Sequence, residues 1–281
     1  MSITFAQINH LESSTNKKLF QKKHDEWYTE YKSIEYHINL FLSQFSLKDK
    51  IIFCPCDNPT FSQFIKYFQN NKGKICYKKL LFNYLKVPIQ HKFGKEYPEG
   101  DFRSEESIEM LKECDVVITN PPFSLIGEFY DLIKKYKKDF LIIAPLLFCC
   151  RKNARKDFVN RKITICENTN YHYFFVDNNG KRKEINCMTI TNYNFKSKRC
   201  FIFTQNNNFN KTYLDNTDII NIEDGENIPD CLHGTLAVSV SQISKVLADD
   251  RIELLCFSQD YGQKLTFNGK NIFSKLIVKK K

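Results

Sequence analysis

A four-residue segment, Asn120-Pro121-Pro122-Phe123, carries the residue types needed to activate an amine on an aromatic ring. Such an amine is a poor nucleophile because its lone pair is delocalised into the ring. Two acceptors, the Asn120 side-chain carbonyl and the Pro121 backbone carbonyl, would favour a more tetrahedral nitrogen whose lone pair points at an incoming methyl group. The prolines fix φ and so set this geometry in advance, and Phe123 offers a flat surface for stacking a base.

The same segment also reads as a simple turn, since Asn-Pro sequences commonly end strands. Its flanks favour the chemical interpretation. The apolar run at 116–119 has the pattern of a buried strand, and an amphipathic helix is predicted from residue 126. In open α/β sheets, ligands bind beyond the carboxyl ends of the strands, where this segment would lie. We therefore predict a catalytic loop at 120–123.

The elements that must position this loop alternate between strand and helix over 27–148. Short apolar runs predict four strands, at 51–54, 79–84, 116–119 and 140–148. Short continuous strands separated by helices indicate an α/β fold with a mostly parallel, twisted sheet and helices on both faces.

The helices of this pattern are predicted from apolar spacing and capping residues. One helix is expected from residue 34 to 45. Another is expected to open at Thr60, which forms a capping box with Gln63. A third should cover 104–113, and Ser124 is a candidate cap for the helix after the catalytic loop.

Beyond about residue 165 the pattern becomes richer in β-structure. Two segments, at 174–185 and 265–273, place Asn-Gly between strand-like runs, the preferred signal for tight hairpins. We divide the chain into a polar N-terminal arm at 1–24, a catalytic core at 25–165 and a β-rich part at 166–281. The last part should complete the sheet and carry target recognition.

Composition excludes several classes of protein. Hydrophobic residues make up 42% of the chain, too many for a disordered protein. The longest apolar run, 140–150, is half the roughly 20 residues needed to cross a membrane, and the N-terminus does not resemble a secretory signal. We expect a cytoplasmic protein with no membrane contact. The eleven cysteines lack zinc-site spacing, so we expect reduced thiols and no metal.

Several segments, in the right chain order, resemble the EcoRI-type family of adenine-specific DNA modification methylases. The similarity is specific over 25–148 and weaker in the C-terminal half, and it is carried by the stretches at 25–35, 51–68, 100–125, 140–145 and 184–193. The resemblance implies a Rossmann-like methyltransferase fold and S-adenosyl-L-methionine as cofactor. It also implies site-specific methylation of adenine N6 in double-stranded DNA, with the base flipped out of the helix.

The resemblance also implies roles for individual residues. Tyr28 and Thr29 would approach the methionine end of the cofactor. Asp57 would receive its amino group or ribose, helped by the N-terminus of the following helix. Asp101 and Phe102 would hold the cofactor's adenine by hydrogen bonding and stacking. The Asn-Pro-Pro-Phe loop would hold the target base.

The chain departs from the wider methyltransferase pattern at two places. The sequence CPCDNP replaces the usual glycine-rich cofactor loop at 54–59. Many methyltransferases also carry an acidic residue after the second strand to bind the ribose hydroxyls. The corresponding stretch here, 78–86, offers only Asn83, which leaves the ribose contact open.

The net charge of +10 favours a polyanionic partner, although an AT-rich genome would also enrich lysine. The charge is concentrated in 134–162, where ten basic residues face two acidic ones, a local excess of +8. We predict DNA contacts there and in a second basic hairpin tip, at Arg151, Lys152, Arg155, Lys156, Lys181 and Arg182.

Two other functions remain open from the sequence. One is an amino-methyltransferase that acts on RNA or on protein glutamine, since those enzymes also use Asn-Pro-Pro loops. The other is a catalytically silent DNA-binding relative. For the favoured function we expect a monomer belonging to a restriction–modification system, with a restriction endonuclease that acts independently, or an orphan or phage relative.

Overall fold

The computed structural model describes residues 28–85, 97–169, 172–176, 181–205, 211–223, 227–230 and 232–281. The predicted N-terminal arm at 1–24 lies outside the described residues.

A six-stranded sheet forms the centre of the N-terminal half. Its order is β3 (Lys79–Asn83), β2 (Ile51–Pro55), β4 (Val116–Thr119), β5 (Asp139–Pro145), β9 (Cys187–Thr191) and β6 (Thr164–Ile165). The first four strands are parallel, and β9 is antiparallel to both of its neighbours. Parallel strands that are buried on both faces read as continuous apolar runs, which is why these four could be predicted.

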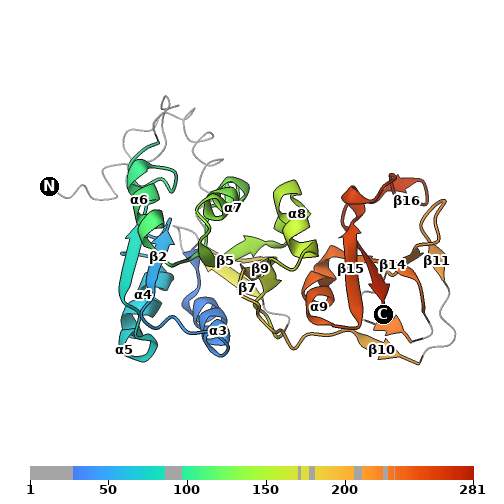
Figure 1. Ribbon diagram of the computed structural model, residues 1–281, viewed down its shortest axis with the longest axis horizontal. Coiled ribbons are helices and arrows are strands. Elements are labelled where there is room, and N and C mark those ends of the chain that lie inside the picture. Colours follow the sequence, from blue (N-terminus) through green and yellow to red (C-terminus); the bar gives the residue numbers. More distant parts are fainter. Residues whose placement is uncertain are drawn as a thin grey trace.

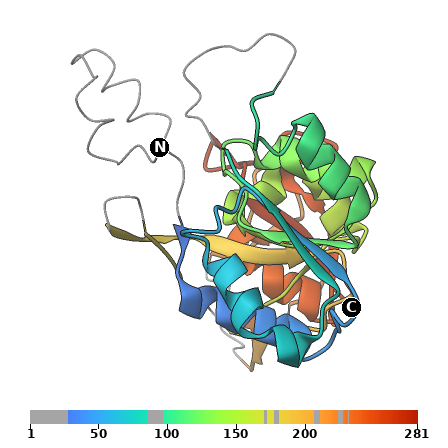
Figure 2. The same cartoon turned by 90° about the vertical axis from the view of Figure 1, so that its left-hand side faces the viewer.

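Helices cover both faces of this sheet, as Figures 1 and 2 show. One face carries α6 (Glu105–Glu113), α7 (Ile126–Lys135) and α8 (Lys152–Val159); the other carries α3 (Tyr31–Leu42), α4 (Gln63–Asn70) and the short α5 (Lys72–Ile75). Each layer buries its own apolar cluster against the strands, with Phe129 and Phe158 in one and Phe41 and Phe68 in the other. The predicted α/β alternation over 27–148 is confirmed.

Two helix starts differ from the prediction. The cap of α4 is Ser62, whose Oγ accepts from the Ile65 N–H at 3.3 Å. Thr60 is not the cap because residues 58–62 form a turn, in which the Ser62 N–H donates to the Asn58 carbonyl at 2.7 Å. In α7 the cap is Leu125 in place of Ser124, and its N–H donates to the Pro122 carbonyl at 2.9 Å.

The predicted strand at 140–148 ends early. β5 stops at Pro145, and residues 146–150 continue as the 3₁₀ helix η2 (Leu146–Cys150). Proline has no N–H to extend the ladder, so the chain turns away from the sheet at this point.

The C-terminal half has a second sheet, seen at the right of Figure 1. Its order is β11 (Thr212–Tyr213), β12 (Ile220–Asn221), β14 (Thr235–Ser239), β18 (Lys275–Lys280) and β15 (Ile252–Phe257). Neighbouring strands are antiparallel except β12 and β14. Beside it lie η3 (Val240–Gln242), α9 (Ile243–Ala248), η4 (Ser258–Asp260) and the parallel pair β10 (Ile202–Thr204) and β13 (Asn227–Pro229).

The antiparallel strand pairing of both predicted hairpins is confirmed, and the turn of the first, at 177–180, lies outside the described residues. β7 (Tyr173–Val176) pairs antiparallel with β8 (Arg182–Ile185), and β16 (Thr266–Phe267) pairs with β17 (Lys270–Asn271). The short strand β1 (Tyr28–Thr29) adds to the free side of β7. β1, β7 and β8 therefore form a small sheet that joins the start of the core to the C-terminal half.

The two large sheets share one apolar cluster, in which Phe158 and Ile163 of the core pack with Val246 and Ile252 of the C-terminal half. Within the described ranges, the structure contains no helix long and apolar enough to span a membrane.

Candidate active site

Polar side chains gather where the parallel strands end. Asp57 follows β2, Asn83 ends β3 and Thr119 ends β4. The Asp57 N–H donates to the Asn83 carbonyl at 2.9 Å, which ties the ends of the first two strands together. The sheet order thus places three loops, distant in sequence, along a single edge.

Asp57 is buried at the centre of this edge. Its carboxyl accepts from the Ser62 hydroxyl at 2.6 Å and contacts the Thr119 hydroxyl at 2.5 Å. Thr119 Oγ1 also lies 2.6 Å from the Pro55 carbonyl. The Thr119 hydroxyl therefore faces two acceptors, the Asp57 carboxyl and the Pro55 carbonyl.

Burial raises the pKa of Asp57 to about 7, with the hydrogen bonds from Ser62 and Thr119 acting in the opposite direction. The carboxyl therefore changes charge near neutral pH. A cationic ligand beside it would favour the ionised form.

The loop at 97–104 lies against the end of β3. Gly100 has φ +87°, and a Cβ at this position would meet the Tyr84 carbonyl oxygen at 1.7 Å. No side chain fits there, so the close approach depends on glycine. The Ser107 hydroxyl then donates to the Asp101 carbonyl at 2.7 Å, which fixes this loop on the first turn of α6.

Within this loop, the Asp101 carboxylate is fixed by Arg103, two residues further along the chain. Arg103 donates to the two carboxylate oxygens from Nε and Nη2, each at 2.9 Å, and these bonds together with Glu128 raise the pKa of the Arg103 guanidinium. Its Nη1 donates to Glu128 on α7 at 2.8 Å. Arg103 thereby connects the loop after β3 to the helix that follows the catalytic loop.

Phe102, which the sequence analysis placed against the cofactor's adenine, lies in the core. Its ring is 4% exposed, packs edge-to-face on Phe129 at 5.1 Å and has the Arg103 guanidinium 5.0 Å from its centroid. The exposed aromatic ring of this loop is Tyr97, 49% exposed, with the same guanidinium 4.4 Å from its centroid.

The Asn-Pro-Pro-Phe loop follows β4 directly. Pro121 is buried, whereas Asn120 and Phe123 are half-buried. The Phe123 ring packs edge-to-face on Phe175 of β7 at 5.8 Å. Since Phe175 pairs with Thr29 of β1, the small sheet supports the loop from one side.

The other residue of β1 faces the loop after β2. The Tyr28 ring lies 6.2 Å from that of Phe61, which is 52% exposed just before α4. β1 therefore lies between the loop that carries Asp57 and the loop that carries Asn120. The structure places the sequence-predicted residues Tyr28, Thr29, Asp57, Asp101 and Asn120 on the elements that surround this edge.

Sequence reasoning missed the residues that hold the site together. Ser62 and Thr119 contact Asp57, and Arg103 clamps Asp101. Thr119 could have been chosen because it is the last residue of the strand before the Asn-Pro-Pro-Phe loop. Arg103 could have been chosen because it follows the predicted adenine contacts Asp101 and Phe102. Their partners depend on the fold, because Thr119 and Asp57 are 62 residues apart.

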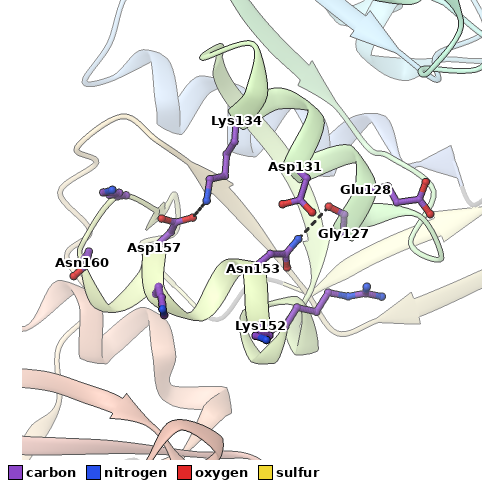
Figure 3. Close-up of a pocket in the computed structure, with 11 residues that line it drawn as sticks. Gly127, Glu128, Asp131, Lys134, Lys152, Asn153, Asp157 and Asn160 are labelled. Atoms are coloured by element: carbon purple, nitrogen blue, oxygen red, sulfur yellow. Dashed lines mark hydrogen bonds and ion pairs between the residues drawn. The ribbon is translucent and has the colours of Figure 1, made fainter.

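A groove of about 820 Å³ runs between α7 and α8, as Figure 3 shows. Asn153 donates to the Gly127 carbonyl at 3.2 Å and joins the two helices at the end nearer the catalytic loop. A Cβ on Gly127 would meet Arg151 Nη1 at 2.8 Å, so the guanidinium lies against the first turn of α7. Exposed Lys152 and Lys156 line the same groove.

Two of the acids along this groove are already neutralised. Asp157 is paired with Lys134 and accepts from the Tyr130 hydroxyl at 2.7 Å, while Glu128 is paired with Arg103. The groove therefore presents a net positive surface beside the Asn-Pro-Pro-Phe loop.

Arg155 does not face this groove. Its Nε and Nη2 donate to the Asp260 carboxylate, each at 2.6 Å, and its Nη1 donates to the Cys150 carbonyl at 2.6 Å. This guanidinium, which the sequence predicts to contact DNA, links α8 to η4 of the C-terminal half.

The second predicted basic patch lies on β8 and the residue before it. Arg182 donates to Glu30 at 2.5 Å and its guanidinium lies 3.5 Å from the centroid of Phe174. Lys181 is exposed beside it. No group of three or more potential metal ligands occurs among the residues that the structure describes.

Comparison with known proteins places the chain in a family. A family model described as adenine-specific methyltransferase EcoRI matches residues 16–97 and 87–281. Type II methyltransferase M.EcoRI of Escherichia coli is 30% identical, with 96% of this chain and 98% of the relative covered. Type II methyltransferase M.MgeORF184P of Mycoplasma genitalium is 29% identical, with 92% and 96% covered.

Type II methyltransferase M.MpnI of Mycoplasma pneumoniae is 36% identical over a shorter region that covers 43% of this chain and 40% of the relative. No solved structure matches.

Proposed function

The chain belongs to the EcoRI family of adenine-specific methyltransferases, and on this premise we propose that it transfers a methyl group from S-adenosyl-L-methionine to adenine N6 in double-stranded DNA. The observation that carries the proposal is the position of the Asn-Pro-Pro-Phe loop. It follows β4, whose last residue, Thr119, contacts Asp57 at the end of β2. A methyl donor at β2 and an amine at β4 would thus be neighbours.

The fold that supports this function is a Rossmann-like methyltransferase fold. The support is the run of four parallel strands, the antiparallel β9 beside β5 and the helices on both faces. β2, the second strand from the β3 edge, brings its following loop to the middle of the carboxyl edge, where nucleotide-like ligands bind in such sheets.

The residues at this edge fit the proposed cofactor. The Thr29 hydroxyl is buried without a hydrogen-bond partner within the described part of the chain, and Asp57 is a buried carboxyl that titrates near neutrality. Both suit a polar ligand that carries an ammonium group and a positive sulfur. We propose that Tyr28, Thr29 and Asp57 hold its methionine part and Asp101 its adenine, with Phe102 supporting the Asp101 loop from the core.

When bound, S-adenosyl-L-methionine supplies an electrophilic methyl group. The chain's own contribution is to present the amine. The Asn120 side-chain carbonyl and the Pro121 carbonyl accept from the two amine hydrogens, which concentrates the nitrogen lone pair toward the methyl group. Pro122 restricts the loop, and Phe123, braced by Phe175, provides a surface for the base.

Adenine must leave the duplex to reach this loop, at a cost of a few kcal/mol. We propose that the groove between α7 and α8 holds the DNA backbone, with Arg151, Lys152 and Lys156 at phosphates. Lys181 and Arg182 would form a second contact. Arg155 would act indirectly, by fixing the C-terminal half against α8.

The test is to incubate the purified protein with methyl-labelled S-adenosyl-L-methionine and, separately, duplex DNA, RNA or protein. We expect label in duplex DNA. Label confined to RNA or to protein glutamine would identify a different amino-methyltransferase. DNA binding without transfer to any substrate would identify a catalytically silent relative.

A further inference from the structure

The end of β3 lacks the acidic residue that would bind the cofactor's ribose, and Asn83 does not replace it. Asn83 is 4% exposed, and its side chain is committed to the protein. Its Oδ1 accepts from the Tyr84 N–H at 2.9 Å, and its Nδ2 donates to Ser107 Oγ at 3.0 Å. The Asn83 side chain is therefore not free to bind a ligand at this edge, but a group that it positions could do so.

The group that Asn83 holds is the carboxylate of Glu106. Asn83 Nδ2 lies 3.3 Å from Glu106 Oε2, and Glu106 is exposed in the first turn of α6. Among the described residues, the Glu106 side chain accepts this hydrogen bond alone, and it does so with one of its two carboxylate oxygens. The second oxygen can accept from a ligand at the carboxyl end of β3.

The neighbouring acids are less suited to this role. Asp101 is buried, accepts from Arg103 with both oxygens and is already assigned to the cofactor's adenine. Asp57 is buried, and its oxygens contact Ser62 and Thr119. Glu106 combines exposure, an available oxygen and a position between the Asp101 loop and the end of β3.

We propose that Glu106 binds the ribose hydroxyls of the cofactor and so replaces the missing strand acid from the adjoining helix. Two vicinal hydroxyls are two donors, and a carboxylate accepts from both with charge-assisted bonds. Asn83 acts as a positioning residue, since its amide fixes the carboxylate in place. This inference rests on the proposed use of S-adenosyl-L-methionine.

A purely structural role for Glu106 predicts a different outcome. A carboxylate in the first turn of α6 also stabilises the helix through its dipole. Glu105 precedes it in the same turn and is also exposed, so it offers a matched control. Glu105→Gln removes the same charge from the helix start without changing the group beside Asn83.

The experiment measures calorimetric binding of S-adenosylhomocysteine and its 2′-deoxy analogue to the full chain. The unmodified protein should bind the ribose form more tightly. Glu106→Gln should weaken binding of the ribose form roughly 10- to 100-fold and remove most of the preference between the two ligands. Glu105→Gln should stay within about 2-fold of the unmodified protein for both ligands.

The Glu106 assignment and the proposed use of S-adenosyl-L-methionine are contradicted by different results. If Glu106→Gln keeps the affinity and the full preference for ribose while the unmodified protein binds, the Glu106 assignment is overturned. If the unmodified protein binds neither ligand, the proposed cofactor itself is wrong. A loss that is equal for Glu105→Gln and Glu106→Gln would show a helix-dipole effect and would also overturn the assignment.

Discussion

The two large sheets organise their polar residues in opposite ways. In the six-stranded sheet, parallel strands β2, β3 and β4 end at one edge, and Asp57, Asn83 and Thr119 meet there. In the five-stranded sheet, the mostly antiparallel strands end alternately at both edges. Its polar contacts are correspondingly dispersed, as in the Asp249–Arg251 pair and the Asp230–Lys280 pair.

This difference suits a chain in which the two sheets have different tasks. Parallel strands concentrate reactive groups from distant segments in one place. An antiparallel sheet offers a stable surface with groups spread over it, which suits contacts along an extended partner. We propose that the six-stranded sheet carries methyl transfer and that the C-terminal half contributes to target recognition.

The largest expected effect tests whether chemistry is confined to the first sheet. Asn120→Ala removes one of the two acceptors at the amine, so turnover should fall by roughly 10³-fold. DNA affinity should stay within about 2-fold, because the basic groove is unchanged. Single-turnover transfer and DNA binding measure the two quantities. Asn194→Ala, at an exposed position after β9, is the control and should retain both.

Normal turnover in Asn120→Ala would show that the acceptor is elsewhere. An equal loss of DNA binding and of turnover would remove the proposed separation between chemistry and recognition.

The second effect concerns the buried carboxyl at the same edge. Burial raises the pKa of Asp57 from 3.8 to about 7. Its contribution to stability is therefore full at low pH and is lost as the pH rises through the folded-state value. Asp57→Asn stays neutral, so its free energy of unfolding should rise relative to that of the unmodified protein by on the order of 2 kcal/mol between about pH 5 and about pH 7. This appears as a growing difference in melting temperature.

Other buried groups do not obscure this comparison. Glu167 has a pKa raised to about 7 by burial, and His37 has a pKa lowered to about 3 by burial. Both are present in the two proteins, so the difference in melting temperature isolates Asp57. A difference that does not change with pH would mean that Asp57 is ionised in the folded protein throughout this range.

The third effect tests how the two sheets are joined. The Arg155 side chain is 14% exposed and that of Asp260 is 37% exposed, and two bonds join them. A double-mutant cycle of Arg155→Ala and Asp260→Ala should give a coupling free energy of unfolding of about 1–2 kcal/mol. The control is the exposed Lys79–Glu113 pair, where about 0.5 kcal/mol or less is expected.

A coupling near zero would show that the Arg155–Asp260 pair does not hold the C-terminal half against α8.

The smallest effect concerns the groove. Replacing both Lys152 and Lys156 by alanine should reduce the slope of log K against log salt by about 2, since each phosphate contact contributes roughly 0.9. The matched control replaces Lys72 and Lys74 on α5, which precedes β3 and lies at the opposite edge of the sheet. An equal change of slope in both double variants would indicate that the groove has no special role.

Much of this arrangement could be predicted from local sequence. The strand at 116–119 was predictable because β-branched residues and burial on both faces produce a continuous apolar run. Asn120 and the two prolines mark the end of this strand, so the loop at 120–123 could also be predicted. The hairpin at 266–271 was also predictable from local sequence, because the Asn-Gly pair marks a tight turn and Gly269 adopts φ +73° there.

The helix start at Thr60 was wrong, and the protein partners of Phe102 and Arg155 could not be predicted, because long-range contacts decide them. Thr60 and Ser62 are both good caps, and the turn at Asn58 selects the second. Phe102 reads as a stacking residue, but Phe129 covers it. Arg155 reads as a DNA contact, yet its partner, Asp260, is 105 residues away. Local patterns cannot specify such partners.

Nucleoside analysis of DNA treated with this protein tests directly whether it methylates adenine N6. Duplex DNA without adenine methylation should be incubated with the protein and S-adenosyl-L-methionine, digested to nucleosides and analysed by mass spectrometry. We expect N6-methyldeoxyadenosine with the unmodified protein and its loss with Asn120→Ala. Methylated cytosine in place of adenine, or N6-methyldeoxyadenosine at equal yield from Asn120→Ala, would contradict the account.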